Sequence, residues 1–306
     1  MSVAYLFPGQ GSQQVGMGRE LYENEPAARA LFDRADAQLG FSLSALCFEG
    51  PEAALTDTIN QQPALFVTSL ATLAAMQVRG EPAPDSMAGH SLGELTALTA
   101  AGSMSFADGL ALVRRRGELM KAAGQREPGA MAAVLALDVN QVTALCAQAS
   151  EETGRPVQVA NDNCPGQVVI SGDTDALEAA VRMAQAVGAR KVVRLPITIA
   201  AHSPLMATAA AEFGAAVAAT PLVAPQIPVI GNVSARPLDT PELIRSELRD
   251  QLTAPVRWTE SMTYLRDQGI ERFVEVGPGE VLLGLMKRID RRAERVKWTL
   301  PERESA

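Results

Sequence analysis

The pentapeptide Gly89-His90-Ser91-Leu92-Gly93 decides the fold of this chain of 306 residues. The short run Ser86–His90 before it predicts a strand, and Leu92–Ala101 after it has the apolar spacing of a helix. A G-x-S-x-G sequence between a strand and a helix is typical of a tight turn that lifts a serine hydroxyl out at the top of an α/β sheet. The pattern therefore predicts an α/β fold with a nucleophilic serine. The alternative is a structural turn whose serine only caps the helix.

Strand and helix signals continue on both sides of this turn. Apolar runs bounded by proline, glycine or polar residues predict strands, and apolar residues at helical spacing predict helices. Gly124 is expected to end the last helix of this first part. The predicted strands and helices outside the middle of the chain are Val3–Phe7, Pro26–Leu39, Pro63–Val78, Ser105–Ala123, Ile227–Ile230 and Arg272–Val276.

The middle of the chain has a different rhythm. Between Ala130 and Leu195 the signals follow the order β-α-β-β-α-β, with Asp138 and Asp173 as helix caps. This order is the ferredoxin-like arrangement. We therefore expect a catalytic domain formed by residues 1–125 and 197–306, α/β hydrolase-like with a parallel sheet, interrupted by a small domain at residues 126–196.

Composition excludes several classes of function. The chain has 27 Lys+Arg and 35 Asp+Glu, a net charge of −8, which argues against general nucleic-acid binding. The three cysteines form no C-x-x-C pair, so neither a disulfide framework nor a metal site is expected. The first basic residue is Arg19, and Pro8-Gly9 interrupts the apolar start, which disfavours a signal peptide. Thr58–Val78 carries too many polar residues to span a bilayer. We expect a cytoplasmic protein that binds neither nucleic acid nor membrane.

Only two histidines are available as a base for the serine, His90 and His202. His90 is adjacent to Ser91 and should leave the backbone in another direction, so elimination favours His202. The alternative is that His202 is a satisfied structural residue. No acidic third member is apparent before His202, so a main-chain carbonyl or an amide side chain would have to orient the imidazole.

Two segments are candidates to stabilise an oxyanion. The backbone N–H of Leu92 lies at the start of the predicted helix, where the helix dipole favours negative charge. The glycine-rich loop Phe7–Gln13 follows the first strand and could supply a second N–H, although a simple structural turn fits its spacing equally well. It is not a dinucleotide-binding sequence, because Gln14 stands where the third glycine should be.

Arg116 lies on the apolar side of its predicted helix, with Leu112, Leu119 and Met120. Arg114 can instead pair with Glu118, four residues on. A buried guanidinium needs an anionic partner, and a substrate carboxylate would fit its two parallel N–H groups. The alternative is that Arg116 extends to the surface.

Taken together, these motifs resemble the malonyl-CoA:acyl carrier protein transacylase family nearly from end to end. The motifs that carry the resemblance, in the family's order, are Phe7-Pro8-Gly9-Gln10-Gly11-Ser12-Gln13, Gln61-Gln62-Pro63-Ala64, Gly89-His90-Ser91-Leu92-Gly93-Glu94, Arg116-Gly117, Pro165-Gly166-Gln167-Val168-Val169, His202-Ser203 and Glu275-Val276-Gly277-Pro278-Gly279. The family also has a ferredoxin-like insertion.

The resemblance implies a ping-pong acyltransferase that supplies extender units for fatty acid synthesis. Ser91 would attack the thioester of malonyl-CoA with His202 as base, and the backbone N–H groups of Gln10 and Leu92 would stabilise the oxyanion. Arg116 would hold the malonyl carboxylate until the phosphopantetheine thiol of acyl carrier protein takes the acyl group.

The resemblance assigns further positions around this site. The main chain of Gln251 would orient the histidine, and Gln62 would line the pocket. Many malonyl-selective members have Ser or Phe before the histidine, whereas this chain has the smaller Ala201, which predicts a looser pocket. Leu92 stands where methylmalonyl-selective relatives have Gln, and this favours malonyl.

An acidic carrier protein would need a basic docking patch. Residues 287–297 carry a net charge of +4, and four of the arginines fall on one face if the segment is helical. We expect docking on Lys287, Arg288 and Arg292. The pair Arg190-Lys191 would join them. The alternative is an ordinary solvated helix face.

Other functions share part of this pattern. A serine thioesterase would use the same serine and histidine but would leave Arg116 without a task. A malonate decarboxylase subunit and a polyketide acyltransferase share the chemistry, and an inactive carrier-protein-binding module would not need these side chains. No metal or redox cofactor is implied, since coenzyme A arrives as part of the substrate. The family suggests a monomer.

Overall fold

The computed structural model describes residues 2–300. Its larger sheet is parallel throughout. From edge to edge it consists of β7 (Val229–Ile230), β2 (Ser86–Gly89), β1 (Val3–Phe7), β8 (Arg272–Glu275) and β9 (Glu294–Lys297). The α/β class with a parallel sheet, expected from the sequence, is confirmed. In residues 2–300 no helix combines the length and the apolar character that crossing a membrane requires.

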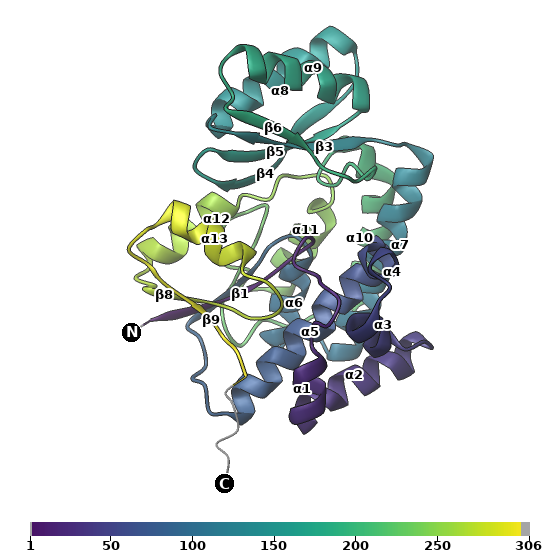
Figure 1. The fold of residues 1–306 in the computed structure, drawn as a ribbon, viewed down its shortest axis with the longest axis vertical. Helices are drawn as coiled ribbons and strands as arrows, with labels where there is room; N and C mark the ends of the chain where they lie inside the picture. The colour runs from purple at the N-terminus through teal and green to yellow at the C-terminus, as the bar shows by residue number, and fades with distance from the viewer. Residues whose placement is uncertain (1, 301–306) are drawn as a thin grey trace.

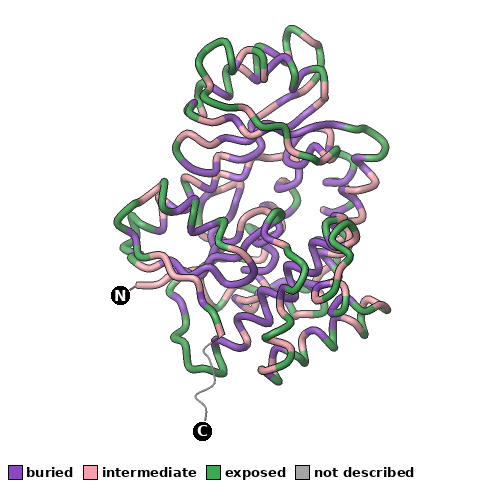
Figure 2. Tube along the Cα trace, viewed as in Figure 1, coloured by how far each residue is buried: buried purple, intermediate pink, exposed green. Residues whose placement is uncertain are grey.

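Helices cover both faces of this sheet because its strands are apolar on both sides. Ala4 and Leu6 pack with α12 (Trp258–Asp267) and α13 (Val281–Ile289), and the alternating neighbours of Ala4 and Leu6 face the other helices. Figure 1 shows α12 and α13 on one side of β1 and β8, and α5 and α6 on the other; Figure 2 shows buried residues along the strands and inner helices. The remaining helices of the large body are α1 (Arg19–Asn24), α2 (Pro26–Leu39), α3 (Leu43–Glu49), α4 (Glu52–Thr56), α5 (Thr58–Val78), α6 (Leu92–Ala100), α7 (Phe106–Arg126), the 3₁₀ turn η1 (Pro204–Met206), α10 (Ala207–Ala219) and α11 (Pro241–Asp250).

The second sheet is antiparallel and has the ferredoxin-like strand order expected from the sequence. In spatial order it consists of β4 (Val157–Cys164), β5 (Gln167–Gly172), β3 (Ala130–Leu135) and β6 (Lys191–Arg194). The helices α8 (Val139–Thr153) and α9 (Thr174–Ala186) bury their apolar faces against it. Figure 1 shows both helices on the side of the sheet away from the large body. The division of the chain into two folding units at 126 and 196 stays a prediction.

Backbone hydrogen bonds join the small sheet to the large body. The N–H of Asp162 donates to the carbonyl of Val256, and the N–H of Val256 donates to the carbonyl of Ala160. Gln158 Nε2 also donates to the carbonyls of His202 and Thr253, each at 2.8 Å. Strand β4 therefore extends its pairing into the segments that surround His202.

The helix expected from Pro63 begins earlier, at Thr58. Its N-cap is Asp57, whose carboxylate accepts the N–H of Ile59, so Pro63 lies inside the helix. A proline there leaves the carbonyl four residues earlier without its N–H partner. Arg114 from α7 donates to that Ile59 carbonyl at 3.4 Å, and its predicted ion pair with Glu118 is confirmed at 2.9 Å.

Gly124 does not end its helix, as the sequence suggested, because α7 continues to Arg126. A Cβ at Gly124 would lie 2.8 Å from Cγ1 of Ile199. The glycine allows the segment before His202 to pass close to α7. The prediction was wrong because a glycine required for close packing and a glycine that stops a helix look the same in the sequence.

The basic segment 287–297 is not one helix, so the prediction that its arginines share one helical face was wrong. Helix α13 ends at Ile289, and Asp290 is extended. Residues 294–297 form strand β9, which pairs in parallel with β8 at the edge of the large sheet. Strand pairing with a neighbour distant in sequence overrides the local helical pattern here.

Candidate active site

The turn at Ser91 joins β2 to α6 at the carboxyl end of the parallel strands. Ser91 has φ 51° and ψ −108°, a backbone conformation that residues other than glycine rarely adopt. A Cβ at Gly89 would lie 1.9 Å from the carbonyl carbon of Gly93, and one at Gly93 would lie 2.1 Å from the carbonyl oxygen of Phe7. Both glycines of the G-x-S-x-G sequence are therefore required by packing, and the strained turn presents the serine hydroxyl to a cavity.

His202 is the histidine that reaches Ser91. Its Nε2 lies 2.8 Å from Ser91 Oγ, and its Nδ1 lies 2.8 Å from the carbonyl of Gln251 and 3.1 Å from that of Ala254. The two carbonyls only accept hydrogen bonds, so Nδ1 carries the proton and Nε2 is left to accept the hydroxyl proton. A main-chain carbonyl therefore takes the orienting position that the aspartate holds in a catalytic triad.

His90 is turned away from the serine. Its Nε2 lies 2.8 Å from Oδ1 of Asn163 on β4, and its ring lies 5.4 Å from that of Trp258. Burial lowers the pKa of His90 below its ordinary value. His90 thus connects the serine turn to the small sheet, and His202 is the histidine within hydrogen-bond distance of Ser91 Oγ.

The pH dependence of acylation is expected to reflect the buried state of His202. Burial lowers the pKa of His202 from 6.5 to about 3, and the charge of Arg116 adds to this effect. If the neutral imidazole acts as the base, kcat/KM for acylation of Ser91 should persist from about pH 7 to about pH 4, where an exposed histidine is almost fully protonated. The rate of acyl-enzyme formation, measured by rapid quenching and intact-protein mass, checks this.

A control for folding is needed in that experiment. In the unfolded chain His202 titrates near 6.5 and in the folded protein near 3, so between these values the unfolded state binds the extra proton. Stability therefore falls as the pH falls through this window, and circular dichroism must show a folded protein at each pH. An acid limb centred near 6.5 in a folded protein would contradict the prediction.

Arg116 is buried, with 2% of its surface exposed, and its guanidinium reaches the serine. Nη2 donates to Ser91 Oγ at 3.0 Å and to Oε1 of Gln251 at 2.9 Å, and Nη1 donates to Oε1 of Gln62 at 3.0 Å. Burial lowers the pKa of Arg116 to about 10, so the group stays charged at neutral pH. All three hydrogen-bond partners are uncharged, which leaves the cation available to an anionic ligand.

The loop 7–13 approaches the serine turn closely. A Cβ at Gly9 would lie 2.4 Å from the carbonyl of His90, and the N–H of His90 donates to the carbonyl of Phe7 at 3.0 Å. Gln10 and Leu92 consequently line the same cavity as Ser91. The N–H of Ser91 itself is engaged with Oδ1 of Asn232 at 2.7 Å.

Sequence reasoning missed Asn232 and Glu94. The Asn232 side chain accepts from the Ser91 N–H and donates to the carbonyl of Gly89 at 2.7 Å, so it holds both sides of the serine turn. Glu94 is completely buried and accepts from Nε2 of Gln251. Nothing in the local pattern marks Asn232, which enters from the loop after β7. Glu94 carried a signal, since a glutamate in an otherwise apolar helix start needs a buried partner.

A cavity of about 410 Å³ opens beside Ser91, between the two sheets. One wall comes from loop 10–13 and from α5 and α7, including Gln62 and Arg116. The opposite wall comes from β3, β4 and the connection 195–197, and Ala201 adds a small apolar surface beside the histidine. The cavity combines apolar walls with one cation, a nucleophile and a base, which suits an acyl group bearing a carboxylate.

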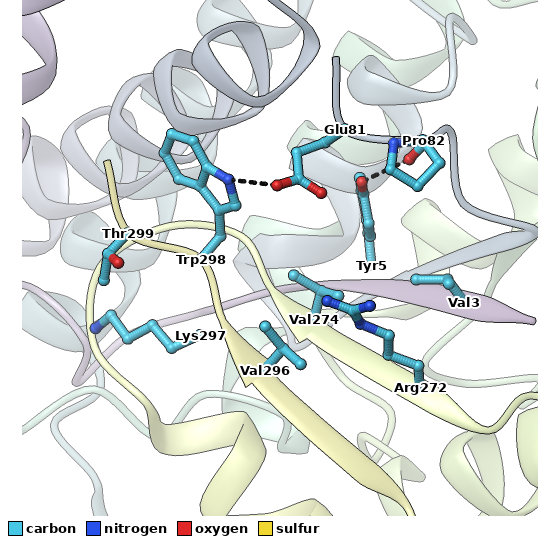
Figure 3. Close-up of a pocket in the computed structure, with 10 residues that line it drawn as sticks. All are labelled: Val3, Tyr5, Glu81, Pro82, Arg272, Val274, Val296, Lys297, Trp298 and Thr299. Atoms are coloured by element: carbon cyan, nitrogen blue, oxygen red, sulfur yellow. Dashed lines mark hydrogen bonds between the residues drawn. The ribbon is translucent and has the colours of Figure 1, made fainter. Parts of the chain in front are cut away.

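A second cavity, of about 210 Å³, is lined by residues of β1, β8 and β9 and of the connection before β2. Figure 3 shows Tyr5 and Arg272 facing it from β1 and β8, with the Tyr5 hydroxyl donating to the carbonyl of Pro82 at 2.7 Å and Trp298 donating to Glu81 at 3.1 Å. The described residues that line it are different from those that line the cavity beside Ser91. The second cavity therefore belongs to a different part of the molecule.

Comparison with known proteins identifies the family. Residues 4–298 match the model of the acyl transferase domain. The malonyl CoA-acyl carrier protein transacylase of Bacillus subtilis (strain 168) is 45% identical over 300 residues, which cover 98% of this chain and 94% of that protein. The chain belongs to the malonyl CoA-acyl carrier protein transacylase family. The resemblance drawn from the sequence motifs is thereby confirmed.

Solved structures of this transacylase family agree with the fold. That of the Coxiella burnetii enzyme has a TM-score of 0.94 at 40% identity and covers 97% of this chain and 93% of its own. A malonyl-transacylase in complex with a type II PKS acyl-carrier protein has a TM-score of 0.94 at 38% identity, covering 97% and 96%. The two-sheet architecture described above is therefore that of the transacylase family.

Proposed function

We propose that this chain transfers a malonyl group from malonyl-CoA to the phosphopantetheine thiol of acyl carrier protein, through an ester on Ser91, and so supplies extender units for fatty acid synthesis. Family membership supports the reaction, since relatives whose alignments cover 94% to 98% of this chain are named malonyl CoA-acyl carrier protein transacylase. One observation carries the mechanism: Ser91 Oγ lies 2.8 Å from Nε2 of His202 and 3.0 Å from Nη2 of Arg116. Nucleophile, base and carboxylate-binding cation thus converge on one atom.

In the first half-reaction, Nε2 of His202 takes the proton of the Ser91 hydroxyl while Oγ attacks the thioester carbon. The tetrahedral intermediate collapses, the carbon–sulfur bond breaks, and the coenzyme A sulfur leaves with the proton from His202. In the second half-reaction the carrier thiol gives its proton to His202 and attacks the ester. Ser91 then leaves and recovers its proton.

Two backbone N–H groups are proposed to stabilise the oxyanion in both half-reactions. Gln10 and Leu92 line the cavity, and Leu92 is the first residue of α6, where the helix dipole adds positive potential. The N–H of Ser91 is committed to Asn232. The backbone N–H groups of Gln10 and Leu92 are therefore the two donors proposed for the oxyanion hole.

Arg116 is proposed to bind the malonyl carboxylate through two parallel N–H···O bonds. In the structure one of these N–H groups donates to Ser91 Oγ. A malonyl carboxylate would replace that contact and free the hydroxyl for attack. The same exchange would raise the pKa of His202, because the arginine charge that helps to lower it is then neutralised. Gln62 would hold the guanidinium from the other side.

The experiment that tests this function is the intact mass of the enzyme after brief incubation with malonyl-CoA and then with acyl carrier protein. We expect one malonyl group on the enzyme, which moves to the carrier in the second step. Release of coenzyme A with no adduct and no acylated carrier would instead identify a thioesterase. No adduct and no release would leave an inactive carrier-protein-binding module.

A basic surface at the end of α13 is proposed to dock the carrier protein. Lys287, Arg288 and Arg292 are exposed, and Arg288 donates to Gln167 Oε1 at 2.8 Å and to the carbonyl of Gly166 at 3.2 Å. Gly166 and Gln167 lie at the hairpin between β4 and β5, and the carbonyl of Gly166 accepts from the N–H of Ala136. The residue before Ala136, Leu135, pairs with Lys191 on β6. These contacts link the α13 cations to Arg190 and Lys191, which are also exposed. The patch therefore does not depend on the helical face that was wrongly expected.

Reversing two charges of this patch should weaken only the second half-reaction. The double variant Lys287→Glu and Arg292→Glu leaves Arg288 in contact with the hairpin, and we expect the carrier-protein KM to rise about 10-fold. Acylation by malonyl-CoA should be unchanged. The matched control is Arg19→Glu with Arg34→Glu, two exposed cations on α1 and α2, at the opposite end of the molecule in Figure 1. An unchanged carrier KM in the first variant would exclude this docking surface.

The enzyme is proposed to act as a monomer in the cytoplasm, where coenzyme A thioesters and carrier protein would both be available. The three cysteines are free and buried in the structure, which is compatible with a reducing compartment.

A further inference from the structure

The side chain of Gln251 joins three groups at the centre of the site. Its Oε1 accepts from Nη2 of Arg116 at 2.9 Å. Its Nε2 donates to the carbonyl of Ser91 at 3.1 Å and to Oε2 of Glu94 at 2.5 Å. The backbone carbonyl of the same residue accepts from His202. One residue therefore contacts the nucleophile's backbone, the base and the arginine.

The donors and acceptors around this amide allow only one orientation. A guanidinium has only donors, so it requires the amide oxygen. The carbonyl of Ser91 and the carboxyl of Glu94 offer acceptors, so they require the amide NH₂. If the amide were reversed, its NH₂ would face Arg116 and its oxygen would face two acceptors. Leaving such buried groups unpaired is costly.

Glu94 supplies one of these two acceptors. The Gln251 amide lies between Glu94 and Arg116 and bonds to both. It is completely buried on the first turn of α6, and its Oε1 has no hydrogen-bond partner within residues 2–300. Burial and the neighbouring Glu247 raise the pKa of Glu94 above its ordinary value; Gln251, the N–H of Asn232 and Arg116 oppose that shift. Whether or not Glu94 is ionised, its Oε2 can accept the amide N–H.

We propose that Glu94 is a positioning residue that fixes the Gln251 amide with its oxygen toward Arg116, and thereby holds the guanidinium beside Ser91 for the substrate carboxylate. This inference rests on the malonyl transfer proposed above. The indirect arrangement has a chemical consequence. A carboxylate hydrogen-bonded directly to Arg116 would compete with the malonyl group for the guanidinium. The uncharged Gln251 amide between Glu94 and Arg116 orients the guanidinium and leaves its charge available to the substrate.

The test compares Glu94→Met with Glu94→Gln. Methionine fills a similar volume and removes the acceptor. Glutamine is nearly isosteric with glutamate and keeps an oxygen that can accept from Gln251. We expect Glu94→Met to lower the ratio of kcat/KM for malonyl-CoA to that for acetyl-CoA at least about 10-fold. In Glu94→Gln the ratio should stay within about 3-fold of the wild type.

Labelling of Ser91 by a neutral fluorophosphonate separates this role from general damage. That reaction needs Ser91 and His202 but no carboxylate site, so its rate should be similar in both Glu94 variants and the wild type. Glu275→Gln is the matched control, because Glu275 is a second completely buried carboxyl that accepts two backbone N–H groups at the start of α13. It should change neither the acyl preference nor the labelling rate.

Each other outcome overturns the inference. Equal loss of malonyl, acetyl and fluorophosphonate reactivity in Glu94→Met would mean that Glu94 only stabilises the fold. An equal loss of preference in both Glu94 variants would mean that its charge, and not its acceptor, is required. If the wild-type enzyme gains no malonyl group at all, the proposed function itself is wrong. This result differs from a failure of the positioning role, because it is seen in the wild type without any variant.

Discussion

Replacement of Ser91 by alanine is expected to abolish the malonyl adduct and to lower malonyl transfer by at least about 10⁴-fold, since losing the nucleophile of such a site removes the covalent route entirely. Ser91 Oγ contacts both Nε2 of His202 and Nη2 of Arg116. The carboxylate-binding groups stay in place in the variant. Malonyl-CoA should therefore still bind to Ser91→Ala, and intact-protein mass together with calorimetric titration measures the two effects separately.

The control for this variant is Ser103→Ala. Ser103 is completely buried, in the segment between α6 and α7, and its hydroxyl has no hydrogen-bond partner among residues 2–300. Its removal should leave both the adduct and the transfer rate unchanged. A malonyl adduct that persists on Ser91→Ala at the wild-type rate would show that another residue is the nucleophile, and peptide mapping would locate it.

Replacement of Arg116 by alanine is expected to lower kcat/KM for malonyl-CoA by about 10²- to 10³-fold, because the malonyl carboxylate loses a buried, charge-assisted pair of hydrogen bonds. Acetyl-CoA has no carboxylate and should lose little, so the preference for malonyl should largely disappear. Arg116→Lys should give an intermediate preference, since lysine keeps the charge but lacks the planar fork. Acyl-enzyme formation from the two thioesters gives the ratio directly.

Arg115→Ala is the matched control on the same helix. Arg115 points outward, and its guanidinium pairs with Glu212 at 2.9 Å, with 46% of its side chain exposed. An exposed pair of this kind contributes little, and we expect less than about a 2-fold change in either rate. If Arg116→Ala lowered the malonyl and acetyl rates equally, the arginine would serve the structure of the site and not the recognition of the carboxylate.

Much of the site could be predicted from the sequence because it is encoded locally. The strand, turn and helix around Ser91 are adjacent in the chain, and each needs only short-range patterns and two glycines. The inward position of Arg116 follows from helical spacing, and the structure buries it as expected. The choice of His202 came from the scarcity of histidines, and it does lie at hydrogen-bond distance from Ser91. The catalytic roles of these residues stay predictions until the variants are measured.

The positions that were wrong or missed depend on contacts between distant segments. Gly124 was taken as a helix stop because its packing partner, Ile199, lies far along the chain. The segment after Ile289 was taken as helix because its pairing with β8 is invisible in its own residues. Asn232 is 141 residues from the serine whose N–H it accepts. No local pattern could have revealed such contacts, since they exist only once the strands have been ordered.

The sequence by itself determined the α/β class, the ferredoxin-like order of the middle segment and the family. It also pointed to the serine, histidine and arginine that contact one another at the site, Ser91, His202 and Arg116. Periodicity, turn glycines and a small set of reactive residue types are sufficient for these conclusions. Only the tertiary structure decided how those groups are oriented. The proton position on His202 and the amide orientation of Gln251 are set by carbonyl, carboxyl and guanidinium groups that fold together from four segments. Hydrogen-bond direction depends on which atoms meet, and that is a property of the packed chain.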